Sequence, residues 1–503
     1  MKYIQTVLIL AIIVAISSCR KDFSAVASSG NLEFSKDTVF LDTIFTNIGS
    51  STYNLKVYNR SSNAISIPQI RLENGITSNY RLNVDGISGK VFQDIEILAN
   101  DSLFVFVETT IDFSALPDPL YLDKILFDTG DNQQDVDLVT LVQDATFIFP
   151  ERDPITMEID QLTLNGQPTT IRGRYLEDSE LTFTKEKPYV IYGYAAVPPN
   201  KTMTIEAGAR IHFHDNSGLI VDELGTLKVN GTLSEKVTFE GDRLEPFFDK
   251  VSGQWGTIWM RAGSKDNELN HAIIKNGVIG VLVDSLGTAG VPTLKIENSE
   301  IYNQSSFGIL GREAQIEGNN VVIGDAGQVS LAATVGGSYK FTHSTFANYW
   351  NNSLRSLPAV LVNNFFVFEN EQGQEITDTR NLIAANFTNC IINGSNNIEF
   401  VIDRVDGGGL FNYFIENCLI EFDDFNNNFA NNNELNFSNT SHYLNNIING
   451  NPDFIGRFDE DFRIGDQSDA INKAKATIFS IDLLGINRSG SPDIGAYQHI
   501  IPE

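Results

Sequence analysis

Residues 31–146 alternate apolar and polar positions with a period of two. In the stretch "SLFVFVETTIDF", Leu103, Val105 and Val107 fall on one side of an extended chain, and the two phenylalanines between them fall on the other. The stretches "NLKVYN" and "DVDLVTLV" repeat this pattern, and turn clusters such as "DTGDNQQ" separate the runs. Several short alternating strands joined by turns are typical of an antiparallel sandwich. We therefore expect an all-β sandwich here, without a cluster of catalytic residues.

From about Thr202 the pattern changes to very short apolar runs, each closed by Gly, Asn or Asp. The stretch "MTIEAGARIHFHDNSGLIVDELGTLKVNGTLSEKVTFEGD" contains five such runs, and in most later segments an Asn or Ser divides two of them. Strands this short suit a parallel β-helix, in which each coil stacks on the previous one at a spacing of about 4.8 Å. We expect this fold over residues 201–450, with residues 147–200 as a linker and N-terminal cap.

Two cysteines lie in matching contexts, "FTNCII" around Cys390 and "IENCLI" around Cys418. They are separated by about one large coil, so we expect them to occupy equivalent positions on successive coils and to stack as small apolar side chains. A disulfide is the alternative, because stacked positions lie near bonding range. The pair lacks the ligand spacing of a zinc site, and no histidine close in sequence supports a catalytic thiol.

The N-terminus has the pattern of an export signal. Lys2 precedes the apolar run "VLILAIIVAI", which is short for a membrane span, and "ISSC" follows it and ends at Cys19. This arrangement resembles the bacterial lipobox, and the resemblance implies cleavage after residue 18, a lipid on the sulfur of Cys19 and attachment to the outer membrane. A plain secretory signal is the alternative. Residues 19–30 then form a flexible tether.

Several stretches resemble known bacterial surface proteins. The "MTIEAG…" stretch, "GQWGTIWMRAGSKDNELNHAIIKNGVIGV" and the C-terminal "INRSGSPDIGAYQH" resemble the right-handed parallel β-helix proteins of the pectate-lyase-like superfamily, the last as a closing segment over residues 451–503. Residues 31–146 resemble the immunoglobulin-like domains of such proteins. Together with the lipobox, these features resemble a Bacteroidetes-type surface lipoprotein. The resemblance implies an immunoglobulin-like β-sandwich followed by a right-handed single-stranded parallel β-helix.

The same resemblance bears on modification of the chain. Four Asp-Ser/Thr-aliphatic tripeptides resemble the O-glycosylation sequence of the Bacteroidetes. Their hydroxyl residues are Thr38, Thr43, Ser102 and Ser285. Because so short a pattern also occurs by chance, the alternative is that about half of them are unmodified.

The charge of the chain limits its partners. Sixty-four Asp and Glu against 35 Lys and Arg give a formal net charge of −29. A surface of this sign repels phosphate backbones, so we expect no nucleic-acid partner. Calcium or another divalent metal is compatible with the acidity, but acidity alone does not indicate a site, and we expect no particular cofactor.

One acidic and one basic stretch could support cleavage of a polysaccharide. Asp423 and Asp424 form the only Asp-Asp pair, and Arg404 lies between two aspartates in "DRVDGGG". Paired carboxylates suit a glycoside hydrolase, and an arginine base beside acidic residues suits a lyase. The alternative is an acidic turn before the Asn-rich "FNNNFANNNELN" and a glycine-rich loop around the arginine.

Two further sets of residues suggest binding. His212 and His214 in "IHFHD" share one face of a strand and could chelate a metal with a third ligand from a neighbouring coil; the alternative is an ordinary strand face. A second set could line a sugar cleft, with aromatic faces against sugar rings, or form packing at the edge of a coil with a local ion pair. It consists of Arg243, Glu245, Trp255 and Trp259.

The sequence contains no G-x-S-x-G, P-loop or dinucleotide fingerprint. We therefore expect a non-catalytic lipoprotein of the cell envelope, attached to the membrane through its lipid anchor. It would bind a glycan or another surface protein along the β-helix, or serve as a rigid envelope component. The alternative is a polysaccharide lyase or glycoside hydrolase acting on an acidic polysaccharide.

Overall fold

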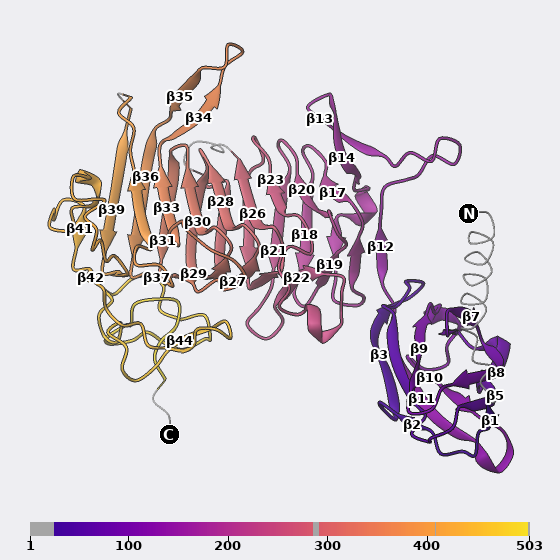
Figure 1. The fold of residues 1–503 in the computed structure, drawn as a ribbon. Coiled ribbons are helices and arrows are strands. Elements are labelled where there is room, and N and C mark those ends of the chain that lie inside the picture. Colours follow the sequence, from indigo (N-terminus) through magenta and orange to yellow (C-terminus); the bar gives the residue numbers. More distant parts are fainter. Residues whose placement is uncertain (1–24, 285–290, 408, 501–503) are drawn as a thin grey trace, which may run out of the picture. The chain divides into compact units, whose positions relative to one another are not determined.

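The computed structural model describes residues 25–284, 291–407 and 409–500 (Figure 1), so Cys19 and Ser285 lie outside the described residues. The chain divides into two compact units, Met1–Asp144 and Ala145–Glu503. Both are built from strands. The helices of the described part are single 3-10 turns: η1 (Gly75–Thr77), η2 (Phe113–Ala115), η3 (Gly130–Asn132), η4 (Asp178–Glu180), η5 (Pro246–Phe248) and η6 (Asn433–Leu435).

The first unit contains two sheets around one apolar core. One sheet has the order β1 (Val26–Ala27), β5 (Ile65–Leu72), β10 (Leu120–Phe127), β11 (Gln134–Gln143) and β3 (Thr38–Phe45), with β8 (Val91–Ile97) also paired to β5. The other has the order β2 (Glu33–Phe34), β4 (Tyr53–Tyr58), β9 (Ser102–Thr109), β6 (Tyr80–Val84) and β7 (Ile87–Gly89). Apart from the parallel β1–β5 and β11–β3 pairs, neighbouring strands are antiparallel.

Strand β9 shows how the alternating pattern creates this core. Leu103, Val105 and Val107 are buried, whereas Phe104 and Phe106 are exposed on the opposite face. The period of two therefore sends the aliphatic side chains inward, as the sequence predicts.

The second unit is dominated by two large, mainly parallel sheets. The nineteen-stranded sheet contains β12 (Thr146–Ile148), β15 (Thr182–Phe183), β16 (Tyr189–Ile191), β18 (Thr202–Glu206), β19 (Arg210–Phe213), β21 (Thr226–Asn230), β22 (Val237–Gly241), β24 (Asn267–Asn270), β25 (Ala272–Lys275), β27 (Leu294–Gln304), β29 (Gln315–Ala326), β31 (Gly337–Thr342), β32 (Thr345–Asn348), β36 (Leu382–Thr388), β37 (Ile391–Gly394), β39 (Phe411–Glu416), β40 (Leu419–Ile420), β41 (Tyr443–Leu444) and β42 (Ile447–Ile448). The ten-stranded sheet contains β13 (Gln161–Leu164), β14 (Gln167–Tyr175), β17 (Tyr194–Val197), β20 (Gly218–Val221), β23 (Ile258–Met260), β26 (Ile279–Asp284), β28 (Phe307–Arg312), β30 (Val329–Thr334), β33 (Val360–Asn363) and β38 (Phe400–Asp403).

The strands of these sheets stack in register, as successive layers of the chain. Ile205 pairs with Val229, Val229 with Leu269, and Leu269 with Ile296. Each of these side chains is buried in one continuous core. Each short apolar run therefore adds one layer of aliphatic side chains to the stack, as the sequence predicts.

Asparagines with left-handed backbone mark bends of the chain in the nineteen-stranded sheet. Asn298, Asn320, Asn389 and Asn417 all adopt the left-handed conformation, with φ between 48° and 56°. Asparagine tolerates this conformation better than most residues. The side-chain amide of Asn320 also donates a hydrogen bond to Oδ1 of Asn298 one layer away, at 2.9 Å. These residues are therefore corners of the chain: Asn389 and Asn417 lie between consecutive strands, whereas Asn298 and Asn320 lie within β27 and β29.

The two cysteines are neighbours in this stack. The backbone N–H of Cys390 donates to Sγ of Cys418 at 3.3 Å, across a separation of 28 residues. Both thiols are free and buried. Burial and the adjacent Cys390 thiol raise the pKa of Cys418 well above its ordinary value. The expected stacking is confirmed, and the disulfide alternative is not formed.

Residues 147–200, expected to form a linker and cap, already contain strands of the large sheets. Strands β12 and β16 pair with each other, and β16 and β17 pair with the first strands beyond residue 200. The reason is local, since "YVI" and "YAAV" offer the same short apolar runs as the later layers. The stack therefore begins near residue 146.

The C-terminal segment, residues 451–500, folds back along one side of the nineteen-stranded sheet (yellow in Figure 1). It contains one short antiparallel pair, β43 (Phe454–Gly456) and β44 (Asp461–Ile464). Its "DIGAY" motif provides contacts to the sheet: the N–H of Ala496 donates to Oγ1 of Thr345 at 3.0 Å, and the hydroxyl of Tyr497 donates to Oε1 of Glu300 at 3.2 Å. The closing segment thus covers a side of the stack.

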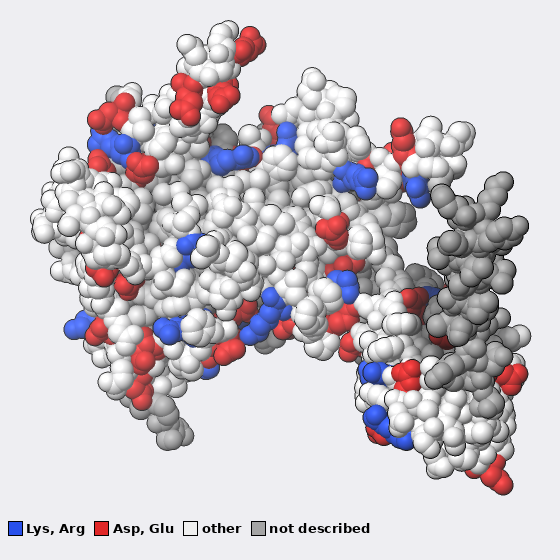
Figure 2. Space-filling view, in the orientation of Figure 1, with Lys and Arg blue, Asp and Glu red and all other residues white. Residues whose placement is uncertain are grey.

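An antiparallel hairpin of β34 (Phe365–Glu369) and β35 (Glu375–Thr379) projects from the stacked strands (Figure 1). Figure 2 shows acidic side chains on it, whereas the middle of the visible face of the stack carries few charged side chains. Among the described residues, no helix has both the length and the apolar character needed to cross a membrane.

Candidate functional site

A large cleft of the second unit lies between the turn that follows β37 and the start of the closing segment. Its volume is about 670 Å³. It is lined by Tyr349, Asn393–Asn397, Glu421 and the run 449–459. Asparagine, carboxylate and aromatic side chains meet here because the chain returns to the stack after its last layer.

Aromatic rings and one arginine form one wall of this cleft. Phe458 is 59% exposed, and its ring meets that of Tyr349 edge to face, with 6.1 Å between centroids. The guanidinium of Arg457 lies 4.8 Å from the centroid of the Phe458 ring and 5.6 Å from that of Tyr349. The Phe458 ring is therefore open to a ligand with a cation beside it, whereas Tyr349 is buried.

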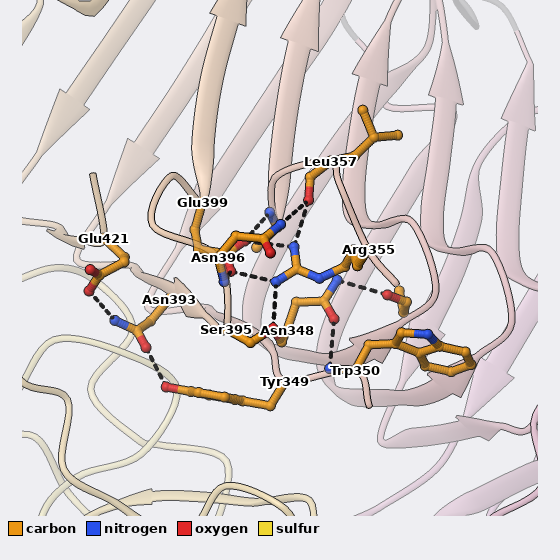
Figure 3. A network of polar contacts seen from close by, with 12 residues as sticks. Asn348, Tyr349, Trp350, Arg355, Leu357, Asn393, Ser395, Asn396, Glu399 and Glu421 are labelled. Carbon is orange, nitrogen blue, oxygen red and sulfur yellow. Dashed lines mark hydrogen bonds and ion pairs between the residues drawn. The ribbon is translucent and has the colours of Figure 1, made fainter. Parts of the chain in front are cut away.

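A chain of hydrogen bonds links Tyr349 to two further lining residues. The hydroxyl of Tyr349 donates to Oδ1 of Asn393, and Nδ2 of Asn393 donates to Oε2 of Glu421 at 3.1 Å (Figure 3). Burial raises the pKa of Glu421 above its ordinary value, and the negative charge of Asp423 adds to this effect. Each of these three side chains is thus oriented by a hydrogen bond to its neighbour.

A second, smaller cleft of about 340 Å³ adjoins the first and shares residues 395–397 with it. Asp423, Asp424 and Phe425 line its far side. The two clefts are therefore neighbours that share the 395–397 turn.

The wall between the clefts is held by a buried ion pair. The guanidinium of Arg355 donates to both carboxylate oxygens of Glu399, and the two side chains are 1% and 0% exposed. Arg355 also donates to the carbonyl oxygens of Asn348 and Leu357, at 2.8 and 2.6 Å. Glu399 accepts the backbone N–H of Asn396 at 2.7 Å. The network in Figure 3 therefore fixes the backbone next to Tyr349 relative to the 395–397 turn.

The predicted catalytic residues do not meet in one place. Asp424 accepts the backbone N–H groups of Asn428 and Phe429, at 2.8 and 2.7 Å, as the alternative of an acidic turn requires. Arg404 forms ion pairs with Asp406 at 3.1 Å and Glu434 at 3.4 Å. Within residues 291–407 and 409–500, no hydrogen bond or ion pair joins Arg404 to Asp423 or Asp424.

The predicted metal ligands have other partners. Nδ1 of His212 lies 3.2 Å from the carbonyl oxygen of Gly241, and burial lowers the pKa of this imidazole. Nδ1 of His214 lies 2.8 Å from Oδ2 of Asp242, and its ring stacks on Tyr192. No group of three or more His, Cys, Asp or Glu in the described part of the chain is arranged to hold a metal ion. The third ligand that a metal requires is therefore not brought to the histidines.

The expected sugar-binding set is also divided. Arg243 pairs with Glu245 at 3.0 Å, and both line a separate cleft of about 450 Å³. Trp255 is buried, because its ring stacks on Phe213 with 4.4 Å between centroids and its N–H donates to a backbone carbonyl. Trp259 belongs to β23 of the ten-stranded sheet. Trp255 is a core residue, and the four residues form no common cleft.

The expected glycosylation residues lie on strands of the first unit where they are described. Thr38 and Thr43 belong to β3 and Ser102 to β9, and all three are partly buried. Sequence reasoning missed the residues of the large cleft, namely Tyr349, Asn393, Glu421, Arg457 and Phe458. The aromatic stretches "FANYW" and "FIGRFDEDF" were visible, but no local pattern indicates that they meet.

No protein-family model and no curated protein matches the chain. Among solved structures, a family 123 glycoside hydrolase from Clostridium perfringens is 14% identical over 22% of this chain and 26% of its own, with a TM-score of 0.15. The E. coli chaperone DraB is 11% identical over 30% of this chain and 82% of its own, with a TM-score of 0.16. A GH87 α-1,3-glucanase from Streptomyces thermodiastaticus is 10% identical over 73% and 79%, with a TM-score of 0.21. Such low TM-scores give these likenesses no weight.

Proposed function

We propose that this chain is a lipid-anchored protein of the bacterial outer membrane that binds a glycan without cleaving it. In this proposal the lipid is carried by Cys19, residues 31–146 form an immunoglobulin-like sandwich, and the stacked strands form a right-handed parallel β-helix. Two sheets around one core support the sandwich. The in-register parallel layers and their left-handed asparagine corners support the β-helix.

The observation that carries the proposal is the cleft beside Tyr349 and Phe458. Exposed rings stack on the C–H faces of sugars, while amide and carboxylate groups hold hydroxyls. The cleft combines both, since the exposed Phe458 ring lines it together with Asn393 and Glu421, which are held in place by hydrogen bonds. A volume of about 670 Å³ accommodates more than one sugar unit.

One observation favours a second function, a glycoside hydrolase. The raised pKa of Glu421 suits a general acid, and Asp423 lies close enough for its charge to raise that pKa. Two neighbouring carboxyl groups, one of them with a raised pKa, are the kind of pair that glycoside hydrolysis uses. The two functions are separated by whether the bound polymer is cut.

The test uses the purified full chain with a panel of neutral and acidic polysaccharides. Affinity electrophoresis measures binding, and new reducing ends are counted in the same samples. We expect retention by at least one polymer, no new ends, and binding about tenfold weaker for Phe458→Ala, because the variant loses a stacking surface. The control is Phe247→Ala, which removes an 80% exposed ring outside the cleft and leaves binding unchanged.

Three results would decide against the proposal. New ends that disappear in Glu421→Gln while retention persists would establish the hydrolase. Equal polysaccharide affinity of Phe458→Ala and the unaltered chain would show that the polysaccharide does not bind at the cleft. Recovery of Cys19→Ala in the membrane fraction to the same extent as the unaltered chain would contradict the lipid anchor.

A further inference from the structure

The outer face of the five-stranded sheet in the first unit carries exposed aromatic rings next to cations. Phe104 and Phe106 of β9 are 45% and 40% exposed. Their rings are nearly parallel, with an interplanar angle of 15° and 6.1 Å between centroids. They occupy consecutive outward positions of one strand, so they form a continuous apolar strip on the sheet surface.

Cations flank this strip from the neighbouring strand. Lys56 of β4 pairs directly with Phe104 in the sheet, and its Nζ lies 5.2 Å from the ring centroids of both Phe104 and Tyr58. The guanidinium of Arg60 lies 4.2 Å from the Tyr58 centroid. Rings and positive charges therefore alternate across β9 and β4.

The strip continues into a cavity at its other end. This cavity has a volume of about 430 Å³ and is lined by Phe106, Arg81, Asn83, Ser88, Lys90 and Glu108, among others. Nδ2 of Asn83 donates to Oγ of Ser88 at 3.2 Å, so these two polar groups are held side by side. The cavity offers the Phe106 ring, the Arg81 guanidinium and hydrogen-bonding groups to one ligand unit, whereas the Lys90 ammonium donates to the carbonyl oxygens of Ile76 and Ser78.

The local charge is opposite to that of the whole chain. Lys56 and Arg60 lie beside the rings of this strip and Arg81 lines the cavity beside Phe106, and the carboxylates paired with these three cations are Glu33, with Arg60, and Glu108, with Arg81. The chain as a whole has 64 acidic against 35 basic residues. An excess of cations at this one face is complementary to a negatively charged ligand.

We propose that this aromatic–cationic face, defined by Lys56, Tyr58, Arg81, Phe104 and Phe106, binds an extended anionic polysaccharide. The C–H faces of the sugars lie on the rings, and the carboxylates or sulfates lie on the cations. The open strip suits a polymer, and the cavity beside Phe106 takes one of its units. This site belongs to the first unit and is independent of the cleft beside Phe458.

Single-stranded nucleic acid presents similar chemistry, since it combines stacking bases with anionic groups. A formal charge of −29 repels the dense phosphates of such a polymer more strongly than the sparser charges of a polysaccharide. The sugar polymer is therefore the occupant that the charge favours, and an oligonucleotide is the competitor in the test.

The test measures dissociation constants of the full chain for β-1,4-polyglucuronate, hydroxyethylcellulose and an oligothymidylate. The first two share a backbone and differ in charge. We expect polyglucuronate to bind at least tenfold more tightly than the other two. The double variant Phe104→Ala/Phe106→Ala and the single variant Lys56→Gln each weaken its binding at least tenfold. Phe40→Ala, which removes a 61% exposed ring from the other sheet, leaves binding unchanged.

Each variant is also combined with Phe458→Ala in one chain, so that the contributions of the cleft and of the aromatic–cationic face to binding are measured separately. The variants alter exposed side chains, and thermal unfolding checks that they fold. Unchanged polyglucuronate affinity in the Phe104→Ala/Phe106→Ala variant overturns the proposal, as does absence of polyglucuronate binding. Equal affinity for hydroxyethylcellulose would show that the ligand need not be anionic. Tighter binding of the oligothymidylate than of polyglucuronate would show that the ligand is a nucleic acid and not a polysaccharide.

Discussion

Arg355 and Glu399 are a fully buried pair of opposite charges. Removing two charges from water is costly, and the cost is offset here by hydrogen bonds to backbone groups on both sides. Glu399 accepts the N–H groups of Ala359 and Asn396, and Arg355 donates to two carbonyl oxygens. The pair therefore organises three separate backbone segments beside the cleft.

Replacement of one residue of the pair should destabilise the folded protein, because the desolvation cost of the remaining buried charge is no longer offset. We expect Glu399→Ala to lower the free energy of unfolding by about 3–5 kcal/mol, because the Arg355 guanidinium is left buried without its counter-charge. Urea denaturation measures the change. The matched control is Glu317→Ala, which breaks an exposed pair with Lys340 and should cost at most about 1 kcal/mol. Equal losses for the two variants would contradict this role for the buried pair.

Asp325 predicts a dependence of stability on pH. Burial and, to a smaller extent, the charge of Glu460 raise the pKa of its carboxyl from 3.8 to about 7, although the backbone N–H of Tyr349 and the charges of Arg355 and Lys250 oppose the shift. The folded state therefore binds the proton more tightly than the unfolded state. The resulting stabilisation is fully present below about pH 4 and is lost as the pH rises toward 7. In Asp325→Asn, the decline between pH 4 and 7 measured by urea denaturation should become shallower, and an unchanged decline would argue against this assignment.

At the scale of elements, the closing segment depends on a residue without a side chain. Gly324 of β29 lies against Phe462, and a Cβ added there would be 2.4 Å from the phenyl ring. Phe462 is fully buried between the segment and the sheet. This close approach is the reason why glycine is required at the position.

We expect Gly324→Ala to loosen the closing segment and to make residues 451–500 cleavable in limited proteolysis at least tenfold faster. Gly49→Ala is the control, because an added Cβ there meets only an ordinary contact at 3.6 Å. Identical cleavage patterns in both variants would show that Phe462 adjusts without displacing the segment. Because part of the large cleft belongs to this segment, Gly324→Ala should also weaken glycan binding.

The stacked thiols give a second prediction for an element. In a Cys19→Ser background, Cys390 and Cys418 should not react with a thiol reagent in the folded protein, because both are buried and the pKa of Cys418 is raised. After unfolding without a reductant, both should react at once. A requirement for reductant before reaction would indicate a disulfide and contradict the free thiols.

The whole molecule consists of two units with separate cores. We expect two unfolding transitions in scanning calorimetry, because neither core contains residues of the other unit. Leu55→Ala should lower the midpoint of one transition, and Ile274→Ala should lower the other, each at a cost of about 2–5 kcal/mol. A single transition that both variants shift equally would show that the units unfold together.

Features that depend on the local order of apolar and polar residues could be predicted from the sequence throughout the chain. The alternation around Val105 placed its neighbours on the correct faces, and the short apolar runs with dividing asparagines indicated stacked parallel strands. The individual surface residues were harder to predict. Trp255 was expected in a ligand cleft but lies in the core, and His212 is buried beside a backbone carbonyl. Sequence spacing does not show which side of a coil faces inward at a turn.

By itself, the sequence determined the all-β character, the change of pattern between the two units and the stacking of Cys390 on Cys418. Each of these follows from side-chain periodicity, which acts between neighbours along the chain. Only the tertiary structure decided where a ligand could bind. Phe458 meets Tyr349 because the closing segment folds back onto the stack, and Lys56 meets Phe104 because two strands pair. Contacts between distant segments depend on how whole elements pack, which local periodicity does not specify.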